Sequence, residues 1–375
     1  MNNKNSFFQS FGWIILAILI LCYLYQNKSS TLSIKSNKIT SILNHIENNY
    51  VDSIDIDLLI ESAINQTLIH LDPHSIYMST EEVKASMESM QGSFDGIGIE
   101  FSIHRDTIII INVIPNGPSE KRGLQAGERI ILIEGENVAG IGITNNEVIT
   151  KLRGKRGTSV KIGVENTQDT VTRIINLTRD KIPLVSLDVA YEIYPGVGYI
   201  KLNRFSATTF SEFKAELKKL QKQNNITSLI LDLRGNTGGY LDQAIKILNE
   251  FFGDNELLVY TEGVSRKKQE YFSDSFGIFK KGEVCVLIDE GSASASEIIA
   301  GAIQDNDRGI IVGEQSFGKG LVQEQIPLKD GSLIRLTVAR YHTPSGRCIQ
   351  KPYTDNQNDY FNNLFYLHRV LGQHQ

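Results

Sequence analysis

The chain has 375 residues, 41% of them hydrophobic and 22% charged, so it can bury a sizeable core in two or three domains. Its net charge of -5 and its lack of long basic runs give no support to nucleic-acid binding. The three cysteines form no disulfide framework or CxxC pair, and the seven histidines show no paired ligand spacing, so no metal site is expected.

An uncharged apolar run, FGWIILAILILCYLY, occupies residues 11–25. With the residues just before it, the run approaches the roughly 20 residues that a membrane-spanning helix needs. It ends in bulky residues rather than in a small-residue cleavage site, which favours an uncleaved anchor over residues 1–30. Leu21 is too large for the residue before a lipidated Cys22, and lysines on both sides leave the orientation undecided by charge alone.

The next stretch, residues 31–91, is predicted to be a small helical region. Apolar residues recur at helical spacing between 39 and 50 and again between 56 and 68. The sequence Ser79-Thr80-Glu81-Glu82 is a capping-box pattern and predicts a third helix that ends near Met90.

The next two regions differ in their pattern of predicted strands and helices. Residues 92–179 contain short β-like runs between glycine-rich turns, with one helix near 144–153, and predict a small barrel or sandwich. From 180 to 352 strands alternate with helices, which indicates an α/β domain with substantial parallel sheet. The tail, residues 353–375, has no assigned role, and a short helix packed on the core is one interpretation of it.

The segment GEQSFGKG at 313–320 nearly spells a phosphate-binding P-loop. Such a loop needs Ser or Thr after the lysine and a helix that begins there. Gly320 follows Lys319 instead, and the next residues alternate like a strand. Nucleotide binding is therefore disfavoured.

Two small-residue segments follow predicted strands. In EGSASASEIIAGAI three serines stand at the start of a helix, which is where acyl-transfer nucleophiles lie beside an oxyanion donor. Taken alone, the segment is explained more simply by close packing of small residues on the sheet. In LDLRGNTGGYL, Gly235, Gly238 and Gly239 permit backbone N–H groups to converge on an oxygen, or form a simple left-handed turn.

Together these segments resemble the carboxyl-terminal processing, or tail-specific, proteases, a family of serine-lysine peptidases. The matching segments include LDPHSIYM, GIGIEF, LDLRGNTGGYL, GSASASEIIAGAI and GEQSFGKGLVQ, in the family's order over roughly residues 40–352. The resemblance implies an α/β core sheet of the Clp protease and crotonase type, into which a PDZ domain is inserted. It implies no metal or organic cofactor.

The resemblance also implies site residues. Ser294 matches the nucleophile, Lys319 the general base and Gln323 its supporting glutamine, with Ala295 and Gly238 as oxyanion donors. Gly238 is chosen over Gly239, and the flanking Ser292 and Ser296 are expected to be structural. A lysine accepts a proton only when neutral, so Lys319 must lie in an apolar pocket that lowers its pKa.

Residues 92–179 resemble the PDZ domain of the family. Gly96, Ile97, Gly98 and Ile99 match the loop and strand that capture a peptide carboxylate while the peptide adds as a strand. Polypeptide C-termini are thus the expected partners. The PDZ domain could deliver substrate or obstruct the site until a peptide arrives.

The sequence therefore predicts a single-pass protease of a bacterial cytoplasmic membrane, with its catalytic domain on the periplasmic side, that cleaves polypeptides near their C-termini. The alternative is a catalytically inactive PDZ adaptor, whose signature would be the loss of Ser294 or Lys319. An oligomer or an activating partner protein is compatible with the sequence. The physiological substrate and the cleavage-site preference cannot be read from it.

Overall fold

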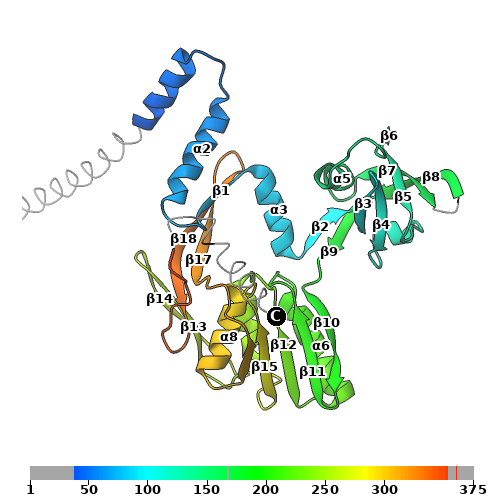
Figure 1. Cartoon of the computed structure of the whole chain (residues 1–375). Coiled ribbons are helices and arrows are strands. Elements are labelled where there is room, and N and C mark those ends of the chain that lie inside the picture. Colours follow the sequence, from blue (N-terminus) through cyan, green and yellow to red (C-terminus); the bar gives the residue numbers. More distant parts are fainter. Residues whose placement is uncertain (1–37, 167–168, 354–359, 361–375) are drawn as a thin grey trace, which may run out of the picture. The chain divides into compact units, whose positions relative to one another are not determined.

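The structure is a computed structural model that describes residues 38–166, 169–353 and 360. The chain divides into two compact units, Met1–Leu71 and Asp72–Gln375 (Figure 1). Within the described residues no helix is both long and apolar enough to cross a membrane. The anchor predicted at 1–30, and the membrane location that depends on it, lie outside the described residues and stay predictions.

The first unit contains a helix at 38–49 and helix α2 (Ile56–Ile69). The Asp55 side chain caps α2 by accepting the backbone N–H groups of Asp57 and Leu58. Both helices coincide with the predicted periodicities.

The second unit opens with strand β1 (Ile76–Met78) and helix α3 (Thr80–Gln91). The predicted capping box is present, because Ser79 Oγ accepts the Glu82 N–H and the Glu82 carboxylate accepts the Ser79 N–H. Gly92 ends α3 in the left-handed conformation, with φ of 70°.

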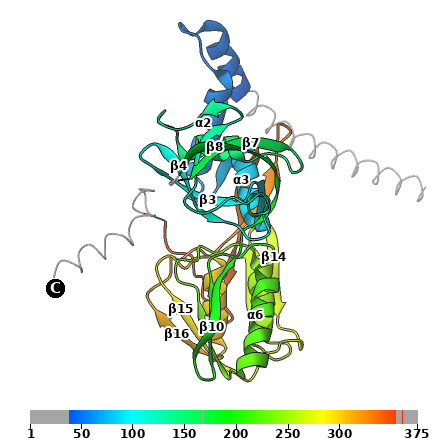
Figure 2. The ribbon, with the colours of Figure 1, turned by 90° about the vertical axis from the view of Figure 1, so that its right-hand side faces the viewer.

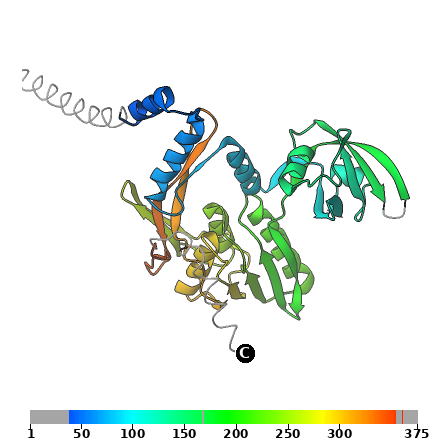
Figure 3. The ribbon, with the colours of Figure 1, turned by 45° about the horizontal axis from the view of Figure 1, so that its top comes forward.

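The region predicted to be a small β domain is a six-stranded sheet, drawn in teal and green in Figure 3. The strand order is β3-β4-β5-β7-β8, with β6 paired to β5, and buried aliphatic residues such as Ile108, Ile130 and Val160 form its separate core. Strands β2 and β9 pair antiparallel where the chain enters and leaves the domain. The elements are β2 (Ser93–Gly96), β3 (Ile99–His104), β4 (Thr107–Val113), α4 (Pro118–Lys121), β5 (Arg129–Ile133), β6 (Glu136–Asn137), α5 (Asn145–Leu152), β7 (Ser159–Asn166), β8 (Asp169–Thr178) and β9 (Asp180–Pro183).

The predicted α/β core is a five-stranded sheet of order β10-β11-β12-β15-β16, parallel from β11 onward. Helix α6 packs on β10 and β11 (Figure 2), and α7 lies between α6 and α8. The strands and helices are β10 (Leu187–Tyr194), β11 (Val197–Leu202), α6 (Thr209–Asn224), β12 (Ser228–Asp232), α7 (Leu241–Asn249), β15 (Glu283–Ile288), α8 (Ala295–Asp305) and β16 (Ile310–Gly313). The alternating fold class with an inserted β domain is thereby confirmed.

A second five-stranded sheet carries the final strands of the core, and the orange pair β17–β18 dominates it in Figure 1. Its order is β1-β18-β13-β14, with β17 paired to β18. The sequence analysis did not anticipate the hairpin β13–β14. These strands are β13 (Leu257–Gly263), β14 (Arg266–Phe272), β17 (Leu321–Pro327) and β18 (Leu333–His342).

Candidate active site

Ser294 lies at the turn between strand β15 and helix α8, beyond the carboxyl end of the parallel strand. Its backbone has φ of 54° and ψ of -111°, a conformation that non-glycine residues rarely adopt. Such strain costs about 1–3 kcal/mol and persists only where surrounding contacts enforce it. The turn resembles the sharp strand-to-helix elbow that exposes a nucleophilic side chain.

The two flanking serines hold this turn in place. Ser292 Oγ donates to the Leu233 carbonyl oxygen at 2.8 Å, and Ser296 Oγ donates to the Asn236 carbonyl oxygen at 2.8 Å. Both serines are fully buried. They join the start of α8 to the glycine-containing turn after β12, which agrees with their expected structural role.

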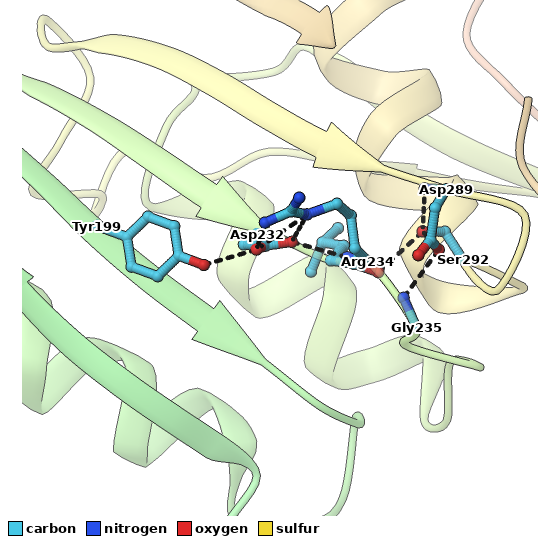
Figure 4. Close-up of polar contacts among 7 residues, drawn as sticks. Tyr199, Asp232, Arg234, Gly235, Asp289 and Ser292 are labelled. Carbon is cyan, nitrogen blue, oxygen red and sulfur yellow. Dashed lines mark hydrogen bonds and ion pairs between the residues drawn. The ribbon is translucent and has the colours of Figure 1, made fainter. Parts of the chain in front are cut away.

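Two aspartates at the ends of β12 and β15 brace the same turn (Figure 4). Asp289 Oδ1 accepts the Gly235 N–H at 2.8 Å, while buried Asp232 forms a two-pronged ion pair with Arg234 and accepts the Tyr199 hydroxyl at 2.6 Å. Burial alone would raise the pKa of Asp232, but the hydrogen bonds from Arg234 and Tyr199 outweigh it and lower that pKa. Asp232 is therefore held as a carboxylate.

The glycine turn lies against Ser294. A Cβ atom at Gly238 would come within 2.8 Å of Ser294 Cβ and 3.0 Å of Ala295 N, so only glycine fits there. The Gly238 N–H, however, donates to Asn236 Oδ1 at 2.9 Å. In this structure the Gly238 N–H group is therefore engaged by Asn236, and the expected role of Gly238 as an oxyanion donor stays a prediction.

The neighbouring Gly239 provides the better donor. Its flanking groups, Gly238 C=O and Tyr240 N–H, both bond Phe205, so the Gly239 N–H points to the opposite side. Among the described residues neither this N–H nor that of Ala295 has a hydrogen-bond acceptor. Both residues stand beside Ser294, and they form the pair of open donors at this turn.

Lys319 lies between strands β16 and β17. This segment is the one that resembles a P-loop but lacks the hydroxyl residue and the helix that a P-loop needs. Burial lowers its pKa, and the nearby Arg335 guanidinium lowers it further, whereas Asp72 and Glu297 act in the opposite direction. No hydrogen-bond partner for Lys319 Nζ exists among the described residues. These surroundings therefore favour the neutral form of the amine more than water does.

Glu297 joins the nucleophile turn to the lysine turn. Its Oε2 accepts the backbone N–H groups of Ser294 and Lys319, each at 2.8 Å. Its Oε1 accepts the Ser316 hydroxyl at 2.8 Å and the Gly318 N–H at 2.7 Å. With 2% of its surface exposed, this carboxylate fixes both turns from the interior.

Tyr341 makes a second connection between the same two residues. Its hydroxyl lies 3.1 Å from the Ser294 carbonyl oxygen and also contacts the Lys319 carbonyl oxygen. Tyr341 is on β18 and is 2% exposed. The backbones of Ser294 and Lys319 are thus held together through their N–H groups by Glu297 and through their carbonyl groups by Tyr341.

A cavity of about 990 Å³ brings most of the predicted catalytic and oxyanion residues together, and Ala295 is the one that does not line it. Its lining includes Ser294, Lys319, Gln323, Gly238 and Gly239. Within the described part of the chain no hydrogen bond joins Ser294 Oγ to Lys319 Nζ. The two side chains are therefore related in this structure by the cavity that both of them line.

Gln323 has a partner that the sequence did not predict. Its Nε2 donates to the His74 carbonyl oxygen at 2.6 Å rather than to Lys319. The side chain lines the same cavity as Lys319. The pairing of β17 with β18 shifts register between Val322 and Gln323. The amide is therefore oriented by the segment before β1.

The predicted peptide-binding residues line a separate groove of about 400 Å³ between β3 and α5. The carbonyls of Ile97 and Gly98 are engaged by Ser119 and by Ile114 N–H, but their own N–H groups have no acceptor among the described residues. Gly98 has φ of 77°, which glycine accommodates without strain. Open N–H groups beside an apolar groove can bind a peptide carboxylate.

Comparison with known proteins places this geometry in a family. Residues 196–357 match peptidase family S41, and residues 96–177 match the PDZ domain. A carboxy-terminal-processing protease of Bartonella bacilliformis is 38% identical over 352 residues, which cover 92% of this chain and 78% of that protein. The chain belongs to the carboxy-terminal processing proteases.

Other members show similar agreement. The carboxy-terminal processing protease CtpB of Bacillus subtilis is 37% identical over 333 residues, covering 87% of this chain and 68% of that protein. Among solved structures, a photosystem II D1 C-terminal processing protease is 28% identical with a TM-score of 0.47, covering 83% of this chain and 89% of that one. The predicted family, and with it a peptidase fold that carries a PDZ domain, is confirmed.

Two members of the site were missed by the sequence analysis. Glu297 had a detectable signal, because Ser294 and Glu297 stand at the S-x-x-E spacing of a capping box. Tyr341 had none, since it reaches Ser294 from a strand 47 positions away. In this carboxy-terminal processing protease both residues hold the backbones of the two turns.

Proposed function

We propose that this chain is a serine-type endopeptidase that hydrolyses polypeptides near their C-termini, with Ser294 as nucleophile and Lys319 as general base. One observation carries the proposal: a serine on a strained strand-to-helix turn and a lysine with a lowered pKa line the same cavity. Membership of peptidase family S41 supports the reaction class.

The proposed reaction begins when neutral Lys319 accepts the Ser294 hydroxyl proton and Oγ attacks the scissile carbonyl carbon. The N–H groups of Ala295 and Gly239 then donate to the oxygen that becomes negative. The Lys319 ammonium returns its proton to the leaving amine as the C–N bond breaks, which leaves an acyl-enzyme. Water, deprotonated by Lys319, hydrolyses that ester and releases Ser294.

Gln323 supports the lysine in this scheme through its oxygen. Its Nε2 donates to the His74 carbonyl oxygen, which leaves Oε1 to accept a hydrogen bond from the Lys319 amine. A neutral amide can orient the amine without the added negative charge that would raise the lysine pKa. This extends the predicted supporting role of Gln323.

The PDZ domain is proposed to bind the substrate C-terminus. The open N–H groups of Ile97 and Gly98 would donate hydrogen bonds to the terminal carboxylate, and the peptide would pair with the edge strand β3 that begins at Ile99. Gly96 completes the turn. Binding at this groove would raise the local concentration of the polypeptide near Ser294.

The test is cleavage of internally quenched peptides, with free or amidated C-termini, by the full chain. Ser294→Ala and Lys319→Ala should each lower kcat by about a thousandfold or more, since members of a catalytic unit fail together. Lys329→Ala, an exposed lysine on a turn, is the matched control and should cleave like the wild type. Amidation of the peptide C-terminus should raise KM for both the wild type and Lys329→Ala.

Two results would contradict the proposal. Unaltered hydrolysis by both the Ser294 and Lys319 variants would exclude the serine-lysine mechanism. Binding of free C-terminal peptides by the wild type without any cleavage would instead identify an inactive PDZ adaptor.

A further inference from the structure

The cavity that contains Ser294 has an excess of basic side chains. Of the titratable side chains that line it, Arg204, Lys319 and Arg335 are basic and only Asp242 is acidic, so two cations remain when Lys319 is neutral. Asp242 is already bonded to Lys246 Nζ at 2.9 Å. The cavity is therefore electropositive toward a ligand that enters it.

Arg335 is the basic residue with the most unusual surroundings. It lies on β18, with Ile76 of β1 and Gln325 of β17 as its strand neighbours. Its Nη2 donates to Ser86 Oγ at 2.9 Å, and no carboxylate of the described residues lies within ion-pair distance. The guanidinium is half-buried, so it has lost hydration without gaining an anion.

The carboxylates of this region are already used by other donors. Asp72 accepts the N–H groups of His74 and Ser75. The Glu297 carboxylate accepts hydrogen bonds from the two turns described above. Neither is available to neutralise Arg335, and four of the five guanidinium N–H donors remain for a ligand.

We propose that Arg335 binds a carboxylate of the peptide that occupies the cavity and so selects substrates with an anionic group close to the scissile bond. The inference rests on the proposed peptidase function. A planar guanidinium recognises a carboxylate through two parallel hydrogen bonds, which gives orientation as well as attraction. The carboxylate can come from an Asp or Glu side chain or from a free C-terminus.

Arg335 has a second, separable effect on the same site. The charged and titratable groups that act on Lys319 are Arg335 on β18, Asp72 before β1, and Glu297 on α8, and His74 is also coupled to it. Arg335 is the cation of this set that opposes the lysine ammonium. Removal of its charge should raise the pKa of Lys319 and move the activity profile to higher pH.

The experiment measures kcat/KM of the full chain on quenched peptides whose ends are acetylated and amidated. A single Asp or Glu is moved along the peptide and compared with Asn or Gln at each position. The wild type should prefer the acidic peptide by about tenfold at one position, chiefly through KM, as a charge-assisted contact predicts. The carboxylate could also be a free C-terminus. This is tested by comparing kcat/KM for neutral peptides that end, with a free or an amidated C-terminus, a few residues from the cleavage point.

In Arg335→Gln the ratio of kcat/KM for the acidic peptide to that for the neutral peptide should fall to about one. Arg335→Lys should retain part of the preference. The matched control is Arg340→Gln, which removes an exposed arginine of the same strand outside this cavity and should keep the preference. On the neutral blocked peptide, Arg335→Gln alone should move the midpoint of the pH profile upward. A merely structural role for Arg335 would not move that midpoint.

Equal cleavage of acidic and neutral peptides by the wild type at every position, with no effect of a free C-terminus, would overturn the inference whether or not the variants fold. A preference that survives in Arg335→Gln would also overturn it. Cleavage that depends on Ser294 but lacks the preference contradicts this inference alone. Cleavage that persists in Ser294→Ala contradicts the proposed function, and the inference falls with it.

Discussion

At the scale of single residues, Lys319 shows how the fold lowers the pKa of a lysine side chain. The ammonium form meets burial and the Arg335 charge, and neither Asp72 nor Glu297 forms an ion pair with it. A group with these neighbours releases its proton more readily than an exposed lysine. The same environment opposes folding at any pH where the lysine is charged.

Because a charged lysine is unfavourable at this position in the folded protein, Lys319→Met should stabilise the protein. The lowered pKa means that the unfolded chain, with its lysine pKa near 10.4, binds more protons than the folded chain at intermediate pH. Stability of the wild type should therefore rise with pH across that interval, and the gain from Lys319→Met, on the order of 1 kcal/mol at pH 7, should shrink toward pH 10.

Urea unfolding at several pH values measures this gain. Lys329→Met, at an exposed turn, is the control and should show no comparable change with pH. A Lys319→Met variant that is less stable than the wild type by a constant amount at all pH values would show that the lysine is a structural residue.

At the scale of secondary-structure elements, Glu297 connects the first turn of α8 to the turn before β17. Its two oxygens accept four donors, and a glutamine there would place an NH₂ group against an N–H or hydroxyl donor in either orientation. Glu297→Gln should therefore cost about 2–4 kcal/mol and lower kcat, because the Ser294 and Lys319 backbones lose their shared acceptor.

Denaturation and cleavage assays on the same preparation test this connection. Glu324→Gln removes an exposed carboxylate that pairs with Arg266, and it should change stability little because solvent screens such a pair. Equal, small effects of the two substitutions on stability and kcat would refute the role of Glu297.

The elements differ in how far the sequence predicted them. The alternation of strands with helices predicted the parallel sheet, and the Ser79 capping box predicted α3, because these signals are local. The β13–β14 hairpin was missed since β14 reads RKKQEYF and is mostly exposed, so it has no alternating apolar face. The sequence cannot distinguish the donors Gly238 and Gly239, because no local pattern shows that the Asn236 side chain accepts the Gly238 N–H.

At the scale of the second unit, residues far apart in sequence meet near Lys319. Tyr360 is 1% exposed, and its hydroxyl lies 2.9 Å from His74 Nε2, across 286 positions. Gln350 Nε2 donates to the same hydroxyl at 2.8 Å, and Lys351 Nζ lies 4.3 Å from the centre of the Tyr360 ring. Because His74 also holds Gln323 through its carbonyl, this packing extends to the proposed site. No sequence pattern predicts contacts at such separations.

This packing makes acid stability depend on Tyr360. Burial lowers the pKa of His74 to about 4, and Lys319 and Lys351 assist while Asp72 opposes. An unfolded histidine, with a pKa near 6.5, takes up its proton earlier, so the wild type should lose stability as the pH falls from 6.5 to 4.

Removal of the ring should change both the size and the pH dependence of stability. Tyr360→Ala should cost about 3 kcal/mol at pH 7, while Tyr360→Phe, which keeps the ring and loses the hydroxyl, should cost about 1 kcal/mol. Since the alanine variant exposes His74 and returns its pKa toward 6.5, the acid-induced loss should be smaller in that variant. Tyr194→Ala, at an exposed tyrosine, is the control. Unfolding curves between pH 4 and 7 that coincide for the wild type and Tyr360→Ala would show that the residue does not anchor this part of the chain.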